Sequence, residues 1–213
     1  MLRTLTAVFI ATPLALLALP GAALGAEATR TLAPFIAVNA KGAFGLSIEA
    51  GAAQSVKISG DDAFIQALKT EVVDNELQIS ISGKLAKSGK GNQQITITLP
   101  SLSRVKVEGA GETIITKVAS ERLDLGYRGA GSLSASGKVK YLRLSAMGVG
   151  EVDTKGLKTE RVDVNFNGVG EVSVYASDTV NIVAKGMGSV TYYGKPKTVN
   201  KSVSGIGSVS AGD

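Results

Sequence analysis

Acidic side chains are the residues of this chain whose spacing could support chemistry. Glu151 and Glu171 each follow a repeated glycine step, one repeat apart, so adjacent strands would hold them about 5 Å apart. Two carboxylates at that distance could bind a cation or exchange protons with a substrate. The simpler interpretation is a solvated pair that nearby Lys155 or Lys158 neutralises, because no third ligand is visible. We regard Glu151 and Glu171 only as candidates for a surface contact.

Three residue types that many active sites need do not occur in the sequence. There is no histidine, cysteine or tryptophan, which removes the commonest general base, the commonest metal ligand, disulfides and the best stacking platform for sugars. We therefore predict no catalytic residue, no metal, no cofactor and no enzymatic activity. The formal charge of +5 is modest and spread along the chain, so we expect no nucleic-acid partner.

Two sets of charged residues have alternative interpretations. A glycine-containing loop carries three basic side chains that we interpret as solvated, although they could contact an anionic glycan or a phosphate: Lys84, Lys87 and Lys90. A second set occupies equivalent places in successive repeats and alternates in sign: Asp124, Arg143 and Asp163. Opposite charges on neighbouring strands attract one another. This second set predicts charge pairing between neighbouring repeats.

A Gly-x-Gly step recurs every 18 to 20 residues in the C-terminal half. Alternating apolar residues precede nearly every step and a β-favouring residue follows each one, which indicates strands. No third glycine or following helix supports a dinucleotide loop, and the period is wrong for a calcium β-roll or collagen. The steps are therefore predicted to be structural turns, formed by Gly109, Gly111, Gly129, Gly131, Gly148, Gly150, Gly168, Gly170, Gly186, Gly188, Gly205 and Gly207.

A fixed period with strand, turn and strand in each unit is typical of a parallel β-helix or β-solenoid. We predict an all-β fold with coils of 18 to 20 residues over residues 101–213, in which the glycines let the same corner recur in every coil. Residues 27–100 lack this period and are predicted to form a β-rich portion. That portion should carry one short helix, capped by Asp61 and Asp62, and a hairpin turn at Asp74-Asn75.

The residue between the two glycines is apolar in every step: Ala110, Ala130, Val149, Val169, Met187 and Ile206. We expect these side chains to turn into the core, because a turn can reverse which side chains face inward. The alternative is an exposed apolar stripe that would contact a partner or a second copy.

The first 26 residues are predicted to be a secretory signal peptide. Arg3 precedes an apolar run, Leu5 to Leu19, that is too short to span a bilayer comfortably, and small residues up to Ala26 offer a cleavage site. We expect an exported protein, periplasmic or secreted, that has no stable membrane span once the signal is removed.

Several segments together resemble a known family. They are Phe35-Ile-Ala-Val38, Val56 to Asp61, Leu77-Gln-Ile79, Ile95 to Pro100, Val105 to Gly111 and the recurring glycine steps. Over roughly residues 30 to 210 the chain resembles the bacterial head GIN domain family, whose members are described as auto-transporter adhesins. The resemblance implies an exported two-part β protein with a parallel β-helical portion. It implies no established activity and no catalytic residues.

Three functions follow from these patterns. The first is a non-catalytic envelope protein that binds, adheres or assembles, with an unknown envelope component or a glycan as its partner. The second is a β-helical carbohydrate-active lyase or hydrolase that would use surface carboxylates, namely Glu151, Glu171, Asp153 and Asp163. The third is self-association through the strands after the last glycine step, unless lysines block that edge: Lys195, Lys197 and Lys201.

Overall fold

The computed structural model describes residues 26–81 and 93–213. Residues 1–25 of the predicted signal, and the three lysines of the predicted basic loop, lie outside these ranges. Ten strands and one helix follow one another along the chain: β1 (Ala26–Arg30), β2 (Ala37–Ala43), β3 (Gly45–Ala50), β4 (Ser55–Gly60), α1 (Asp62–Ala67), β5 (Leu68–Val73), β6 (Glu76–Ile81), β7 (Gln94–Leu99), β8 (Arg104–Tyr175), β9 (Thr179–Tyr193) and β10 (Thr198–Ala211).

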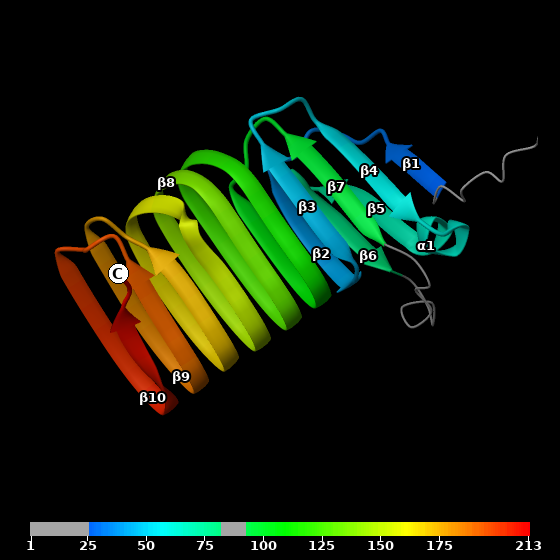
Figure 1. Ribbon diagram of the computed structural model, residues 1–213. Helices are drawn as coiled ribbons and strands as arrows, with labels where there is room; N and C mark the ends of the chain where they lie inside the picture. The colour runs from blue at the N-terminus through cyan, green and yellow to red at the C-terminus, as the bar shows by residue number, and fades with distance from the viewer. Residues whose placement is uncertain (1–25, 82–92) are drawn as a thin grey trace, which may run out of the picture.

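The expected class, a parallel β-helix built from separate strand-turn-strand coils, is wrong. All ten strands belong to one mixed sheet, because β1 with β4, β4 with β7 and β5 with β6 pair antiparallel. Residues 104–175 form a single strand of 72 residues that no turn interrupts. The fold is all-β, a nearly closed, barrel-like sheet that includes one very long strand and curls around the core (Figure 1).

The long strand returns to its starting side every 18 to 20 residues, and we call each such stretch a winding. β9 pairs parallel with the last part of β8, so that Gly168 lies beside Gly186. β10 pairs parallel with β9, and Gly186 lies beside Gly205. Equivalent residues therefore stand in columns, one residue from each winding, and about 4.8 Å separates neighbouring members of a column.

The N-terminal part covers one end of the curled sheet (Figure 1). β2 and β3 pair parallel with the beginning of β8, so the portions predicted on either side of residue 100 share one sheet. The predicted helix is confirmed: the Asp61 carboxylate accepts a hydrogen bond of 2.7 Å from the backbone N–H of Phe64. The predicted hairpin is confirmed too, because Asp74 and Asn75 have φ of 50° and 59° between β5 and β6.

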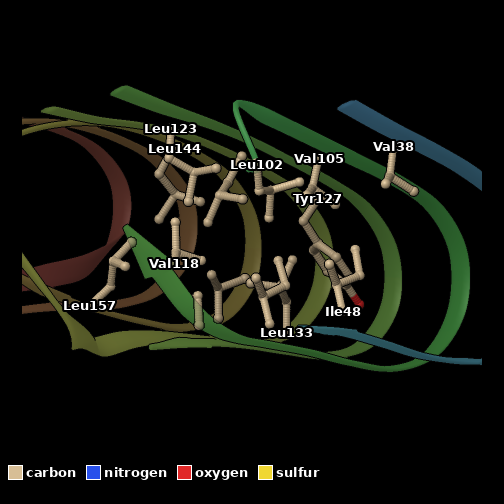
Figure 2. Close-up of a cluster of buried hydrophobic side chains, with 14 of the residues drawn as sticks. Val38, Ile48, Leu102, Val105, Val118, Leu123, Tyr127, Leu133, Leu144 and Leu157 are labelled. Carbon is tan, nitrogen blue, oxygen red and sulfur yellow. The ribbon is translucent and has the colours of Figure 1, made fainter. Parts of the chain in front are cut away.

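Side chains from the two sides of the sheet meet in one core (Figure 2). Alternate residues point inward, so that Leu123, Leu125 and Tyr127 of one stretch are all buried. Leu133 lies beyond the next glycine step and is also buried. Leu133 is six positions after Tyr127, an even interval, so the alternation passes through the step unchanged.

This unbroken alternation corrects the expectation for the residue between the glycines. The glycines themselves take the inward places, and the apolar residue between them points outward. Val149, Val169, Met187 and Ile206 are 57%, 41%, 52% and 78% exposed, and Ala110 and Ala130 are exposed as well. The prediction that this column lies in the core is wrong, because the step does not reverse the inward side.

The last winding differs from the others on its inward side. Val199 and Val203 are 36% and 44% exposed, whereas Val180 and Ala184, beside them in β9, are buried. Lys201 stands between the two valines, and its ammonium donates a hydrogen bond of 3.4 Å to the carbonyl of Val209. A charged group at an inward place disfavours pairing of this edge with another strand.

Candidate functional site

Polar side chains cover the stretches of strand that precede the glycine steps. We call their outward side chains the polar face, which spans residues 104–106, 122–128, 141–147, 161–167 and 179–185. The inward neighbours of these side chains, such as Leu142 and Leu144, are buried in the core. The strand alternation therefore presents a regular lattice of polar groups, one row from each winding.

Tyr141 lies at the centre of one edge of this face. The guanidinium of Arg122 stands 5.1 Å from its ring centroid, and that of Arg161 stands 5.4 Å from it. These three residues occupy equivalent places in three successive windings. Each arginine also contacts the carboxylate two residues further along its own strand, Arg122 to Asp124 at 2.9 Å and Arg161 to Asp163 at 3.4 Å. Cation–π contact and ion pairing fix both guanidinium groups.

Asp163 accepts hydrogen bonds from neighbours on both sides. The Tyr141 hydroxyl donates to it at 2.5 Å and the Asn181 amide at 2.6 Å, and Asn200 in turn donates to Asn181 at 2.8 Å. Burial works against ionisation of Asp163, but the hydrogen bonds from Tyr141, Asn181 and Arg161 outweigh it and lower its pKa. The bond to Asp163 is the largest cause that raises the pKa of Tyr141. The network joins four windings into one rigid support.

Two shallow depressions lie side by side on the polar face, and together we call them the Arg143 trough. One has a volume of about 300 Å³ and is lined by Arg104, Lys106, Asp124, Leu125, Gly126, Arg143 and Ser145. The other has a volume of about 380 Å³ and is lined by Tyr141, Arg143, Leu144, Ser145, Asp163, Val164, Asn165, Asn181 and Val183. The small side chains of Gly126 and Ser145 leave this space open.

Arg143 stands between the two depressions and contributes to both. Its side chain is exposed, and in residues 26–81 and 93–213 neither Arg143 nor Lys106 belongs to an ion pair. A guanidinium presents several N–H donors in a plane, which suits a carboxylate or a phosphate. Asn165, Asn181 and Ser145 line the same depression as Arg143, and their amide and hydroxyl groups can bond to hydroxyl groups of a ligand.

The two candidate carboxylates lie elsewhere, beside the glycine steps. Glu151 and Glu171 are both exposed and occupy equivalent places one winding apart. The expected neutralising lysines have other partners: Lys155 contacts Asp153 at 2.9 Å, and the Lys158 ammonium lies 3.9 Å from the Tyr175 ring centroid. In the described part of the chain, no group of three or more acidic side chains is placed to hold a metal ion.

The four carboxylates considered for an enzyme are not gathered in one cleft. Asp163 lines the Arg143 trough, whereas Asp153 lines a separate depression beyond the glycine steps, together with Ser134 and Ser136. Glu151 and Glu171 stand at the corner between these two surfaces. The four carboxylates therefore do not form one site.

The glycines of the steps lie inside the strands, at inward places of a tight corner. A Cβ atom on any of the twelve would overlap the backbone of the adjacent winding. The overlapped residue is the equivalent glycine of that winding, except that Gly109 meets Gly42 and Gly111 meets Phe44. The twelve glycines hold the shape of the sheet and line no depression on the polar face.

The expected charge pairing between windings differs from what the structure shows. Asp124 and Asp163 contact the arginine two residues earlier in their own strand, and Arg143 stays outside these pairs. The alternation in sign identifies the column of Arg143 from the sequence, but it does not identify Tyr141, Asn181 or Asn200 as part of the site. Two residues before Asp124, Arg143 and Asp163 stand Arg122, Tyr141 and Arg161. Aligning the repeats places these three in one column, and an aromatic residue between two arginines is a sequence signal for the cation–π contacts.

The fold and the candidate site define a class: an all-β protein whose regular windings present a polar face. Residues 34–196 match the family described as "Putative auto-transporter adhesin, head GIN domain". Because the match covers most of the chain, this protein belongs to the head GIN domain family. The resemblance found in the sequence is thus confirmed. A search of curated proteins finds no match.

Two solved structures have a similar fold. A "putative adhesin" from Bacteroides fragilis is 20% identical with a TM-score of 0.71, over 89% of this chain and 98% of that one. A "putative adhesin" from Parabacteroides merdae is 15% identical with a TM-score of 0.52, over 91% and 98% of the two chains. At these identities the likeness concerns the fold. In the described residues, no helix is long and apolar enough to cross a membrane.

Proposed function

We propose that this protein is an exported, non-catalytic binding protein of the cell envelope, and that it adheres to an anionic glycan through the Arg143 trough. The observation that carries the proposal is the exposed Arg143 side chain between two depressions lined with amide and hydroxyl groups. Membership of a family described as adhesins and the apolar N-terminal segment support adhesion and export.

A glycan suits this surface for physical reasons. Its hydroxyl groups can exchange hydrogen bonds with amides such as those of Asn165 and Asn181, and its carboxylate or sulfate can bind the Arg143 guanidinium. The trough is shallow and runs across windings about 4.8 Å apart, so it fits an extended chain better than a compact molecule. Tyr141, Asp163 and Asn181 line the trough and are held by hydrogen bonds to one another, so little of their side-chain entropy is lost when a ligand binds.

Binding of the purified protein to a uronic-acid polymer and to a neutral polymer tests the proposal. We expect binding to the acidic polymer only, and at least tenfold weaker binding for Arg143→Gln. Lys138→Gln is the matched control, because it removes one exposed positive charge outside the trough. Binding should also weaken as salt rises, since the ion contact is exposed. Equal binding by the two variants would show that the trough is not the site.

The alternative of a carbohydrate-active enzyme is tested in the same samples. Incubation with the acidic polymer, followed by measurement of new reducing ends and of unsaturated ends, should show no increase over a blank. Release of either product in proportion to protein concentration would overturn the non-catalytic part of the proposal. Loss of that release in Asp163→Asn would then assign the activity to the trough.

A further inference from the structure

An apolar ridge runs along the corner of the molecule at the glycine steps. It consists of the residues between the paired glycines, Ala110, Ala130, Val149, Val169, Met187 and Ile206. All six are exposed, and Ile206 reaches 78%. Five intervals of about 4.8 Å between parallel strands make the ridge about 24 Å long.

Nothing in the fold requires apolar side chains at these places. The backbone clash at the corner concerns the inward glycines, and the larger side chains between them remain 41% to 78% exposed. Outward columns nearby, on the polar face, carry mostly charged residues and asparagine. A continuous apolar strip on a polar surface is typical of a contact with another macromolecule.

The two sides of the ridge carry opposite charges. On the side before the glycines stand Arg128 and Lys185, together with Glu108, whose carboxylate lies 3.8 Å from the Lys41 ammonium. On the side after the glycines stand Glu112, Glu151 and Glu171. Arg128, Lys185 and these last three glutamates are exposed. None of them belongs to an ion pair within the described ranges. The ridge therefore has one basic flank and one acidic flank, both available to a partner.

This charge pattern is complementary to itself in one arrangement. If two copies meet ridge to ridge about a two-fold axis parallel to the ridge, the basic flank of each copy faces the acidic flank of the other. Arg128 and Lys185 then stand about one winding from partner carboxylates at the positions of Glu151 and Glu171. If the copies run in opposite directions, acidic flank faces acidic flank, which costs energy.

We propose that the ridge is the interface of a two-fold symmetric homodimer whose two copies lie side by side with their windings stacked in the same direction. Each ridge residue then faces its own counterpart, so Val149 meets Val149 and Ile206 meets Ile206. The ridge is narrow compared with a standard interface of about 800 Å² on each partner. The dimer is therefore weak, with a dissociation constant of about 1 µM or higher.

Sedimentation of the purified protein over a concentration series tests the dimer without any glycan. We expect a reversible monomer–dimer equilibrium with no larger species, and at least tenfold weaker association for the double variant Val169→Ser with Met187→Ser. Val183→Ser is the matched control, because Val183 is also an outward apolar residue, 39% exposed, but lies on the polar face. Circular dichroism of each variant verifies the fold.

Single cysteines distinguish the two directions, since the chain has no cysteine of its own. In the proposed arrangement Val149→Cys and Ile206→Cys should each give a disulfide-linked dimer under mild oxidation. In the opposite direction at most one of these positions can meet its own counterpart. Cross-linking at only one position, or equal association of the ridge and control variants, overturns the proposal. A monomer at every concentration overturns the proposal as well. This holds even if the monomer binds lipid vesicles through its ridge.

Discussion

Replacing Gly150 by alanine tests whether the glycines are what allows the windings to stack. Gly150 has φ of 142°, a backbone conformation that residues other than glycine rarely adopt. A Cβ atom there would overlap the carbonyl oxygen of Gly131 and lie 3.0 Å from its carbonyl carbon and 3.1 Å from its nitrogen. These are backbone atoms of the adjacent winding, so no side-chain rotation relieves the overlap.

The expected loss can be assembled from two contributions. Forcing a non-glycine residue into this backbone region costs about 1–3 kcal/mol. Moving the two windings apart weakens about two backbone hydrogen bonds, at about 1 kcal/mol each. We therefore expect Gly150→Ala to lower the free energy of unfolding by about 3–5 kcal/mol. For a chain of this size, that corresponds to a melting temperature lower by about 10 °C.

Urea unfolding followed by circular dichroism measures this loss. Gly126→Ala is the matched control, because the nearest atom to its new Cβ is the flexible Lys106 side chain at 3.4 Å. We expect that control to remain within about 1 kcal/mol of the wild type. Gly207→Ala should have an intermediate effect, since it lies in β10, which pairs only with β9 and can move outward.

A loss below about 1 kcal/mol for Gly150→Ala would refute the reasoning, because that is no larger than the expected change in the control. It would mean that the windings accommodate a Cβ atom at the corner. If Gly150→Ala does not fold at all, the intermediate position of Gly207→Ala relative to Gly126→Ala still tests the argument.

Three further predictions concern the helix, the polar face and export. Asp61→Ala should lower the unfolding free energy by about 1 kcal/mol by removing the helix cap, whereas Asp61→Asn should retain most of it; equal losses would contradict the capping role. The pKa of Asp163 is lowered in the folded protein, so its ionised form stabilises the fold above the unfolded pKa and this stability is lost as pH falls through the folded pKa. The difference in unfolding free energy between the wild type and Asp163→Asn should accordingly be largest above the unfolded pKa of about 3.9 and should shrink as pH falls below it, and a difference that is constant with pH would exclude this linkage. Mass spectrometry of the protein recovered outside the cytoplasm should find Glu27 at the N-terminus, and recovery only of a chain that retains residues 1–25 would contradict signal cleavage.

Local features of the fold could be predicted from the sequence where they depend on residues within a single element. The helix cap at Asp61 and the hairpin turn at Asp74-Asn75 depend on residues close together in the chain, and both were predicted. The strands before the glycine steps were also predicted, because the alternation of Leu123, Leu125 and Tyr127 has a period of two.

The predicted fold class, a parallel β-helix, was wrong because the alternation of apolar residues does not specify which distant segments pair. The antiparallel pairing of β4 with β7 joins residues about forty positions apart, and no pattern in either strand specifies its partner. The glycine steps were interpreted as breaks between strands. The even spacing from Tyr127 to Leu133 shows instead that one strand continues through each step, which also explains why Val149 and Val169 are exposed.

The candidate site was only partly predictable for a related reason. Arg143 was noticed because its column alternates in sign, but the ion pairs of Asp124 and Asp163 form within each strand. Contacts between side chains two residues apart compete with contacts between windings, and the sequence does not indicate which is favoured. Alignment of the windings could have identified Tyr141, because it depends only on the repeat length.

The unbroken alternation of inward and outward residues separates two kinds of constraint along the same strand. Inward positions must fill the core or, at the corner, must be glycine, whereas outward positions do not fill the core. Surface chemistry can consequently vary one column at a time without repacking the core. This independence is consistent with a TM-score of 0.71 at 20% identity to the Bacteroides fragilis structure. It also makes the windings suitable for display of a chosen row of side chains at a spacing of about 4.8 Å.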